Sequence, residues 1–580
     1  MWFLLPFAMH GLRYPLGPDG PVYLWWTRLA GYDGLSAVPR PGVPAVALTL
    51  VGTLHLPLTA VTAALEVSLA VALGLGAWAL ARTGGGGGAT AFVAGLLAGT
   101  FAVHLASGYL ATLAFAVAFI GGLVALARTE PRATIGAAVL FAAAVLSHPL
   151  FSLLGLAIVA VAAGSSWRAD RGDAERIARA VAGAAAIAGS GILALQAGPS
   201  PLQVDTSRDG FLRRAGLDDV LRSAYLDRFI HRWTRYVQWL SLPLAALGWR
   251  APSPFVRRVL RAWALVTVAG VGVSLATGWL PADRFLTFGF AIPVLAAFAI
   301  ARALDLPLAR RRRRLALAGA AALVVAMLAG SWIAWARQEP FLSDREVAAV
   351  AVADAAAEAA PRGTPFVFVV NDEDTTVSFL ATRAGNVIRA AVSPDRIRDV
   401  VVLVPPAGEG DTDPERAALT ELTQRDVRDA PSVPSGPWRF VLAPFDPVDP
   451  VEGWTSVGPG VFLLADHAPT VPSTGALSLE PLEPAETPEI SIASLGALLL
   501  FGLAGYGWAR AASIAPGAPA IAAAPAFGWG AFVIVAITLE RVGLPLTDTI
   551  GPAIVSAVTI GGGHGLRLLL ERRARTRPAT

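Results

Sequence analysis

Long apolar stretches alternate with short arginine-rich segments along most of this chain. A helix needs about 20 apolar residues to cross the roughly 30 Å hydrocarbon core of a bilayer. Stretches with little or no charge occur at 58–81, 88–105, 108–127, 133–148, 149–166, 181–204, 236–249, 262–282, 285–301, 315–336, 490–509, 515–539 and 549–566. Together with the apolar stub 1–10, they predict a polytopic α-helical membrane protein with about 13–14 transmembrane helices.

The composition supports the membrane class and removes several others. Hydrophobic residues make up 55% of the 580 residues, and charged residues only 15%, against the roughly 25% usual for soluble domains. The chain has no cysteine, which excludes disulfides and thiolate metal sites. All 46 basic residues are arginine, and they gather between apolar stretches. We therefore expect these arginine clusters to face the cytoplasm, and we expect no binding of nucleic acid.

Arginine placement predicts the orientation of the helices, because cytoplasmic loops carry an excess of basic residues. The block at 310–314 lies between two apolar stretches, and a second basic cluster at 572–577 follows the last one. Counting crossings from the block places the first loop, 11–57, and the polar region 337–489 outside, provided that 42–57 is an interfacial helix. The predicted parts are a transmembrane module at 1–336, an extracytoplasmic α/β domain at 337–489, and C-terminal helices with a cytoplasmic basic tail at 490–580.

The polar region has the pattern of a compact α/β domain. Ser343 and Glu346 have the spacing of a capping box, which predicts a helix to about residue 360. The acidic triplet 372–374 resembles the DxD metal motif of enzymes that use nucleotide sugars. Nucleotide sugars are cytoplasmic, whereas this region is predicted to lie outside, so we interpret the triplet as a solvated turn. Predicted strands lie at 364–370, 386–391, 399–404, 438–443 and 460–465, with a helix near 414–428.

Candidate chemistry gathers in the first loop, at 16–36. Asp19 follows the short apolar N-terminus, and Asp33 lies in a glycine-bounded turn. Both acids have a plain alternative, because Asp-Gly sequences commonly form turns. Aromatic and basic residues stand between the acids: Tyr23, Trp25, Trp26 and Arg28. These side chains are suited to binding a sugar, although aromatic residues at a membrane surface also form the ordinary interfacial belt.

Three further polar residues fall within or beside predicted spans. Glu66 lies inside 58–81, where an ionised carboxylate is costly and therefore suggests function. Two other interpretations need no function: Glu66 lies near the outer boundary of the membrane, or its carboxyl group is protonated. His104 and His148 fall at predicted outer helix ends, where each lines a cavity or makes an interfacial hydrogen bond. The step from His148 to Pro149 divides one apolar run into a predicted helical hairpin.

The loop 198–235 carries seven arginines on the predicted outer side. Asp218 and Arg222 have helical i, i+4 spacing, and apolar residues form a stripe beside them. The pattern predicts an amphipathic surface helix. Its two interpretations are a solvated connection and a helix that grips a lipid phosphate.

Two segments resemble the GT-C superfamily of membrane glycosyltransferases, which use polyprenyl-phosphate-linked sugars and include oligosaccharyltransferase catalytic subunits. DGPVYL at 19–24 is similar to the acidic motif of the family's first loop. LPADRFL at 280–286 is similar to the segment where a late helix opens with an arginine. The layout of residues 1–340 fits the same family. The chain departs from it in a shortened first helix and in lacking a second acid pair of the kind some members use.

The resemblance implies transfer of a sugar from a polyprenyl-phosphate carrier to an extracytoplasmic glycan, lipid or protein acceptor. Asp19 is then the candidate general base, with Asp33 a second catalytic candidate. Arg284 is the candidate cation for the leaving phosphate, and Tyr23, Trp26, Arg28, Glu66 and His148 are candidates for binding substrate. We expect no cofactor, because the missing acid pair leaves a divalent metal without support. The alternatives are a transporter or flippase of a lipid-linked or anionic substrate, and a non-catalytic membrane scaffold.

Overall fold

The computed structural model describes residues 2–17, 19–101, 109–197, 238–277, 282–304, 310–338 and 482–575, and shorter segments between 340 and 464. Eight helices in these residues are long and apolar enough to cross a membrane. They are α4 (Leu58–Thr83), α9 (Pro149–Ala169), α10 (Arg171–Gln196), α14 (Pro254–Thr277), α17 (Arg310–Ala336), α21 (Thr487–Ala511), α22 (Ala518–Arg541) and α23 (Ile550–Arg575). The chain is a multi-pass membrane protein, as the apolar pattern predicted.

The remaining predicted spans are present as shorter helices. They are α5 (Gly88–Thr100), α7 (Leu110–Leu126), α8 (Pro131–Ser147), α13 (Ser241–Gly248) and α16 (Ala291–Leu304). The helix α3 (Gly42–Leu54) has 13 residues and rises about 20 Å, too little to cross a bilayer. This length fits the interfacial helix that the orientation scheme requires.

Several predicted spans have different ends in the structure. For example, α14 begins at Pro254 rather than at 262, and α23 ends at Arg575 rather than at 566. The helix α10 begins at Arg171 rather than at 181, because Asp170 caps it by accepting backbone N–H groups from Gly172 and Asp173. Its first turns are charged, so the apolar pattern missed them. The predicted span 285–301 is broken at residues 288–290 into α15 (Ala282–Thr287) and α16.

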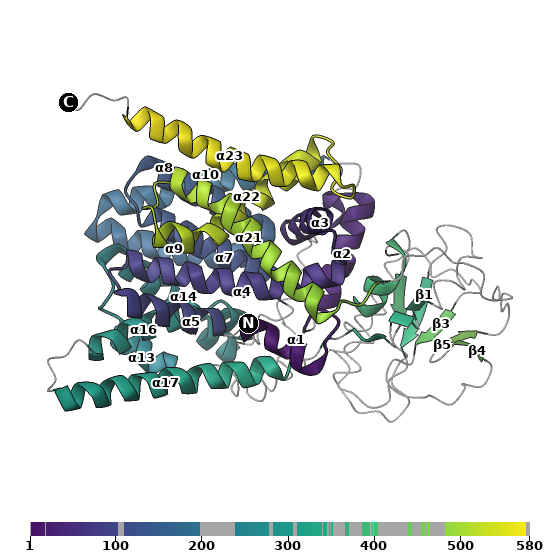
Figure 1. The fold of residues 1–580 in the computed structure, drawn as a ribbon, viewed down its shortest axis with the longest axis horizontal. Helices are drawn as coiled ribbons and strands as arrows, with labels where there is room; N and C mark the ends of the chain where they lie inside the picture. The colour runs from purple at the N-terminus through teal and green to yellow at the C-terminus, as the bar shows by residue number, and fades with distance from the viewer. Residues whose placement is uncertain are drawn as a thin grey trace.

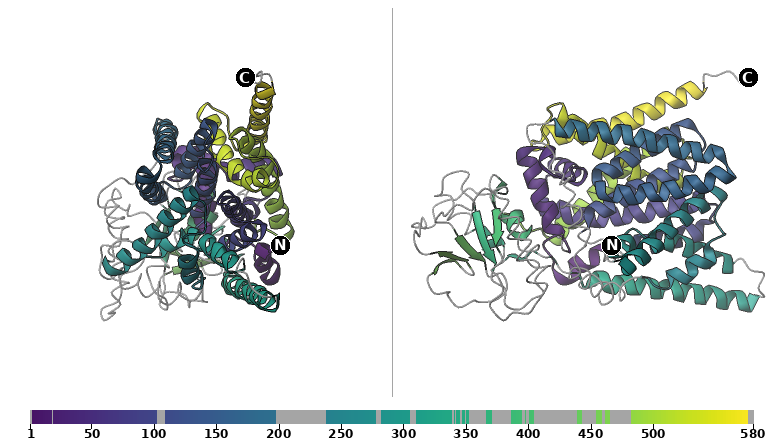
Figure 2. Two further views of the ribbon diagram at one scale, coloured as in Figure 1. Left: turned by 90° about the vertical axis from the view of Figure 1, so that its left-hand side faces the viewer. Right: turned by 180° about the vertical axis from the view of Figure 1, so that it is seen from behind.

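The long helices run side by side, and the sheet lies beyond one end of the bundle (Figure 1). The helices α1 (Leu5–His10) and α2 (Gly20–Asp33) lie with α3 at the same end, next to the sheet. The view from behind shows the same arrangement (Figure 2). The first loop is therefore placed between the bundle and the polar region.

The bundle has a buried centre and an apolar outer surface. The most apolar part of α22 is 83% buried inside the protein, whereas that of α17 is only 11% buried. Such an exposed apolar helix is stable where lipid solvates it. In the centre, Gly505 of α21 and Gly528 of α22 let two backbones meet, since an added Cβ on Gly505 would lie 1.7 Å from the carbonyl oxygen of Ala524.

The polar region contains a five-stranded sheet in the order β2-β1-β3-β5-β4. Its central strand pairs, β1 with β2 and β1 with β3, are parallel, and the pairs that include β5 are antiparallel. The strands are β1 (Phe366–Val370), β2 (Val400–Leu403), β3 (Arg439–Leu442), β4 (Trp454–Gly458) and β5 (Val461–Leu464). Four of them match predicted strands, and β4 was not predicted.

One predicted strand is wrong, since residues 386–391 are helical. Val387, Ile388 and Ala391 are buried there, at the i, i+1 and i+4 spacing of a helix face. A short apolar run carries too little periodicity to separate helix from strand. The expected helix near 414–428 and the acidic triplet 372–374 lie outside the described residues, and the domain boundaries 337–489 remain a prediction.

Candidate functional site

Asp19 stands immediately before α2, in the backbone conformation of a residue entering the helix (φ −90°, ψ −5°). Its carboxylate makes no capping hydrogen bond to the helix, although its backbone carbonyl accepts the Tyr23 N–H at 3.1 Å. Pro21 in the first turn has the fixed φ that starts a helix well. A capping aspartate would use its carboxylate on those first N–H groups. The described geometry therefore does not account for Asp19 as a helix cap.

The Tyr23 side chain lies one turn further along α2 and is buried. Its hydroxyl oxygen accepts the backbone N–H of Ala111, at the start of α7, at 3.1 Å. Arg40 donates to the same oxygen at 3.4 Å. Burial raises the pKa of the Tyr23 phenol; Arg40 opposes the rise, and the Asp19 carboxylate adds to it. Asp19 and Arg40 thus both act electrostatically on one phenol.

Aromatic rings surround this phenol. Trp26 packs edge-to-face against Tyr23, with ring centroids 5.5 Å apart, and Trp25 packs against Trp26 at 5.6 Å. The guanidinium of Arg40 lies over the Trp26 ring, 5.4 Å from its centroid. Tyr23 and Trp26, both predicted candidates, therefore belong to one cluster with Arg40.

Sequence reasoning did not select Arg40, which lies in the turn between η2 (Leu35–Ala37) and α3. A signal was present, since Arg40 stands between two prolines in the first loop. Proline fixes its own φ and restricts the backbone of the residue before it, so the backbone around Arg40 has few conformations. Arg40 is partly exposed, so its guanidinium is accessible at the protein surface.

Asp33 is the last residue of α2, fourteen positions after Asp19. At 1.5 Å per residue the two acids are about 20 Å apart along the helix. Attack on one carbon requires groups within hydrogen-bond reach. The two predicted catalytic acids therefore cannot serve the same reacting atom. Asp19 is the one that acts electrostatically on the Tyr23 phenol.

Glu66 is almost completely buried in α4. Its carboxylate accepts the backbone N–H of Leu16 at 3.1 Å. Leu16 is itself buried and stands three residues before Asp19. A buried carboxylate is tolerated where it is hydrogen-bonded. This contact fixes the segment that leads into the Asp19 turn.

Arg28 contacts the polar region. It donates to the carbonyl oxygens of Ala390 at 2.5 Å and Val392 at 2.7 Å, at the C-terminal end of the helix 386–391. A cation at this end stabilises the helix by pairing its last carbonyls. Arg389 of the same helix lies over the Trp25 ring, 5.8 Å from its centroid. Arg28 thus links α2 to the polar region.

Other contacts join the first loop to the same region. Arg13 forms an ion pair with Asp344 at 2.8 Å, and the Tyr14 hydroxyl donates to the other carboxylate oxygen at 2.9 Å. Leu16 and Gly17 form bridges with Pro340. The segment before Asp19 is therefore held by α4 on one side and by residues 340–344 on the other.

Three predicted polar residues remain: His148, His104 and Arg284. The structure describes the side chain of His148, but not those of the other two. His148 is buried between α8 and α9, and its Nδ1 accepts the Phe151 N–H at 3.3 Å. It therefore caps α9 at the predicted hairpin. His104 lies outside the described residues. Arg284 lies on α15, but its side chain is outside the described part.

In the described residues, no group of three or more histidine, aspartate or glutamate side chains is placed to hold a metal ion. The arrangement offers a carboxylate, a guanidinium and aromatic faces around the start of α2. A carboxylate accepts a proton, a guanidinium pairs with a phosphate, and aromatic faces suit sugar rings.

No protein-family model matches the chain, and no curated protein matches it. Among solved structures it resembles ArnT from Cupriavidus metallidurans bound to undecaprenyl phosphate, with 14% identity and a TM-score of 0.43 over 76% of this chain and 91% of that one. It also resembles the apo oligosaccharyltransferase of Archaeoglobus fulgidus, with 12% identity and a TM-score of 0.40 over 74% of this chain and 66% of that one. These distant likenesses assign no role to any residue here. Both neighbours belong to the GT-C superfamily, the family that the first-loop motif resembles.

Proposed function

We propose that this chain is a membrane glycosyltransferase that moves a sugar from a polyprenyl-phosphate carrier to an acceptor hydroxyl or amide on the extracytoplasmic side. The observation that carries the proposal is the hydrogen bond from Arg40 to the buried Tyr23 phenol, one turn of α2 after Asp19, whose carboxylate helps to raise the pKa of that phenol. A lipid-linked donor and a polar acceptor meet only at the membrane surface. In Figure 1, α2 lies at the end of the bundle next to the sheet, which we propose is the extracytoplasmic surface.

Asp19 acts as the general base in this proposal. The acceptor oxygen or nitrogen forms a bond to the anomeric carbon from the face opposite the phosphate, and its proton passes to the Asp19 carboxylate. The bond from the anomeric carbon to the phosphate oxygen breaks, and polyprenyl phosphate leaves with the bonding electron pair. The product sugar has inverted configuration at that carbon.

Arg40 stabilises the leaving phosphate, whose negative charge grows as the glycosidic bond breaks. A guanidinium makes strong paired hydrogen bonds to phosphate oxygens. Tyr23 and Trp26 hold Arg40 in place through its hydrogen bond and its stacking contact. Arg284, at the start of α15, is proposed as a second cation for the same phosphate.

Glu66 and Arg28 are proposed to position the site rather than to bind substrate, because their contacts are to backbone groups. His148 is proposed to fix the α8–α9 turn in the same way. The polar region 337–489 is proposed to lie outside the membrane above the site, where its contacts with Arg13 and Arg28 hold the first loop.

The proposal is tested with membranes that contain the full chain and a radiolabelled polyprenyl-phosphate sugar. We expect label to leave the lipid carrier and to appear in a new glycoside, and Arg40→Gln to slow this transfer about 10–100-fold, the value of a hydrogen bond to a charged group. Arg82→Gln is the matched control and should leave transfer unchanged. Arg82 lies at the C-terminal end of α4, away from the first loop, and also donates to a backbone carbonyl, that of Gly86. Label that crosses the membrane with its phosphate bond intact would instead indicate a flippase.

A further inference from the structure

A second group of charges lies at the end of the bundle away from the first loop. The start of α4 is held near the polar region, since Thr59 donates to the Glu483 carbonyl. Gly84, just after the other end of α4, accepts the Ser253 N–H at 2.8 Å. This contact places the start of α14 at the far end of the bundle, where α9 passes into α10.

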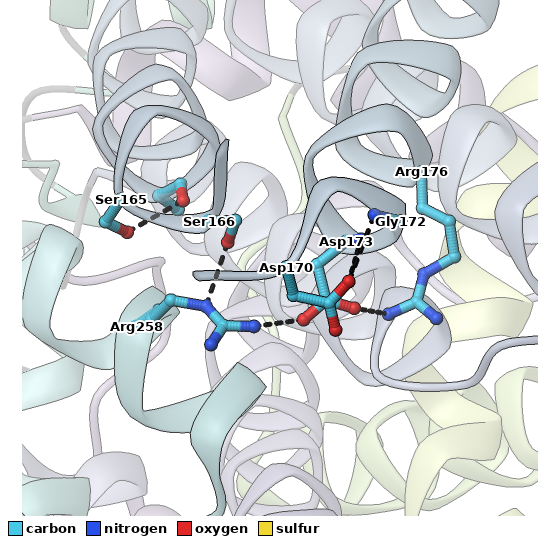
Figure 3. Close-up of polar contacts among 8 residues, drawn as sticks. Ser165, Ser166, Asp170, Gly172, Asp173, Arg176 and Arg258 are labelled. Carbon is cyan, nitrogen blue, oxygen red and sulfur yellow. Dashed lines mark hydrogen bonds and ion pairs between the residues drawn. The ribbon is translucent and has the colours of Figure 1, made fainter. Parts of the chain in front are cut away.

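Two arginines share one aspartate there (Figure 3). Asp173 of α10 accepts hydrogen bonds from Arg176 of the same helix and from Arg258 of α14. Arg258 also donates from Nε to the Ser166 hydroxyl at 2.9 Å. The three charged side chains are only 9%, 11% and 15% exposed. One carboxylate therefore serves two largely buried guanidinium groups, and one positive charge is left in excess.

The Arg176 guanidinium retains binding capacity. Its Nε is buried and has no hydrogen-bond partner in the described part of the chain. The Arg176 guanidinium also lies over the Phe255 ring, 5.5 Å from the ring centroid. A buried donor without an acceptor is costly, so an anion that reaches it gains more than one at a solvated arginine.

Exposed cations extend this cluster to the surface. Arg168 and Arg171 flank the turn between α9 and α10, and Arg171 lies over the Trp167 ring at 5.3 Å. The nearby acid, Asp170, uses its carboxylate to cap α10. The turn and the cluster together hold four guanidinium groups against two carboxylates, Asp170 and Asp173. An exposed tryptophan beside arginines is typical of the level of lipid headgroups.

Apolar side chains continue from the cluster into the membrane. Val161 of α9 is exposed, five residues before Ser166, and Leu265 and Val268 of α14 are exposed beyond Arg258. At 1.5 Å per residue these positions begin about 8–11 Å from the charged groups. An acyl chain lying on them leaves its headgroup at the arginines.

We propose that Arg171, Arg176 and Arg258 bind the phosphate of an anionic phospholipid, with its acyl chains on the exposed faces of α9 and α14. The site lies at the end of the bundle opposite Asp19, so it is separate from the proposed glycosyl transfer. A lipid bound there bridges α10 and α14, which the Asp173–Arg258 ion pair already joins.

The test measures binding of fluorescent phosphatidylglycerol to the purified full chain in neutral detergent. We expect phosphatidylglycerol to bind more tightly than phosphatidylcholine, and Arg171→Gln and Arg176→Gln each to weaken it about fivefold, the value of one arginine near a lipid surface. Arg313→Gln, an exposed arginine of α17, is the matched control and should leave binding unchanged.

Equal binding of both lipids, or equal loss in the Arg313→Gln control, would overturn the proposal. Displacement of the fluorescent lipid by millimolar inorganic phosphate would show a site for free anions and would also overturn it. Because Arg171 is exposed, its substitution keeps the test valid even where Arg176→Gln lowers the yield of folded protein.

Discussion

The Tyr23 hydroxyl of α2 is hydrogen-bonded both to the start of α7, through the Ala111 N–H, and to Arg40. Tyr23→Phe keeps the ring packing but leaves the buried Ala111 N–H without its acceptor. Such a loss costs about 1–3 kcal/mol. We expect a lower thermal transition for Tyr23→Phe in detergent at neutral pH. An unchanged transition would mean that this hydrogen bond is not formed.

The same residue sets a pH dependence. Because burial raises the pKa of Tyr23, the folded chain holds the phenol proton more tightly than the unfolded chain. Stability attributable to this group is therefore constant below the usual tyrosine value of about 10 and falls as the pH rises from there to the raised pKa. Tyr23→Phe should show a smaller loss of thermal stability between pH 9 and pH 11 than the unsubstituted chain.

Two substitutions of Glu66 distinguish positioning of the first loop from a role that needs the negative charge of the carboxylate. Glu66→Gln retains an oxygen that accepts the Leu16 N–H, whereas Glu66→Leu removes it. We expect Glu66→Gln to keep most of the sugar-transfer rate. We expect Glu66→Leu to lower the free energy of unfolding by about 1–3 kcal/mol and to raise the activation free energy of transfer by a similar amount. A Gln variant as inactive as the Leu variant would contradict the positioning role.

Residues of the proposed site could be selected from the sequence where their chemistry is local. Asp19, Tyr23 and Trp26 stand out within one short loop, and the structure places Tyr23 and Trp26 in one cluster near Asp19. Arg40 was missed because its importance comes from contacts across the first loop, which spacing does not reveal. The backbone partners of Arg28 lie more than 360 positions away, so no local pattern could identify them.

At the scale of elements, α2 joins the bundle to the polar region through Arg28. Arg28→Met removes a charged donor from two carbonyls at the end of the helix 386–391. We expect faster cleavage of the polar region by proteinase K, because each such bond contributes about 1.5–3 kcal/mol. Arg82→Met, which removes a bond to a carbonyl at the other end of the bundle, is the control and should leave cleavage unchanged.

Most helices were predictable because lipid demands long apolar runs, and α4, α17 and α22 begin and end within a few residues of the predicted bounds. The observed helix ends differ from the predicted ones where a helix includes charged residues or where its backbone is irregular. The charged start of α10 has a cap that the apolar pattern does not include. The break at Phe288 is stabilised by Trp263, whose indole donates to the Phe288 carbonyl at 2.6 Å, a contact between distant residues.

At the scale of the whole molecule, the proposed orientation places α2 and the five-arginine end of α17 on opposite sides of the membrane. The chain has no cysteine, so single cysteines report on orientation. We expect an impermeant maleimide to label Tyr32→Cys in intact cells, because Tyr32 is 60% exposed at the end of α2. Arg313→Cys should be labelled only after permeabilisation, and the reverse pattern would contradict the orientation.

In the proposed reaction, Asp19 takes the acceptor proton during sugar transfer. The most direct measurement compares transfer from a radiolabelled polyprenyl-phosphate sugar by Asp19→Asn and by Asp33→Asn, the acids at the two ends of α2. The account predicts that Asp19→Asn lowers the rate about 10²–10⁴-fold, the usual value of a general base, while Asp33→Asn retains it. Equal rates for Asp19→Asn and the unsubstituted chain would contradict the account.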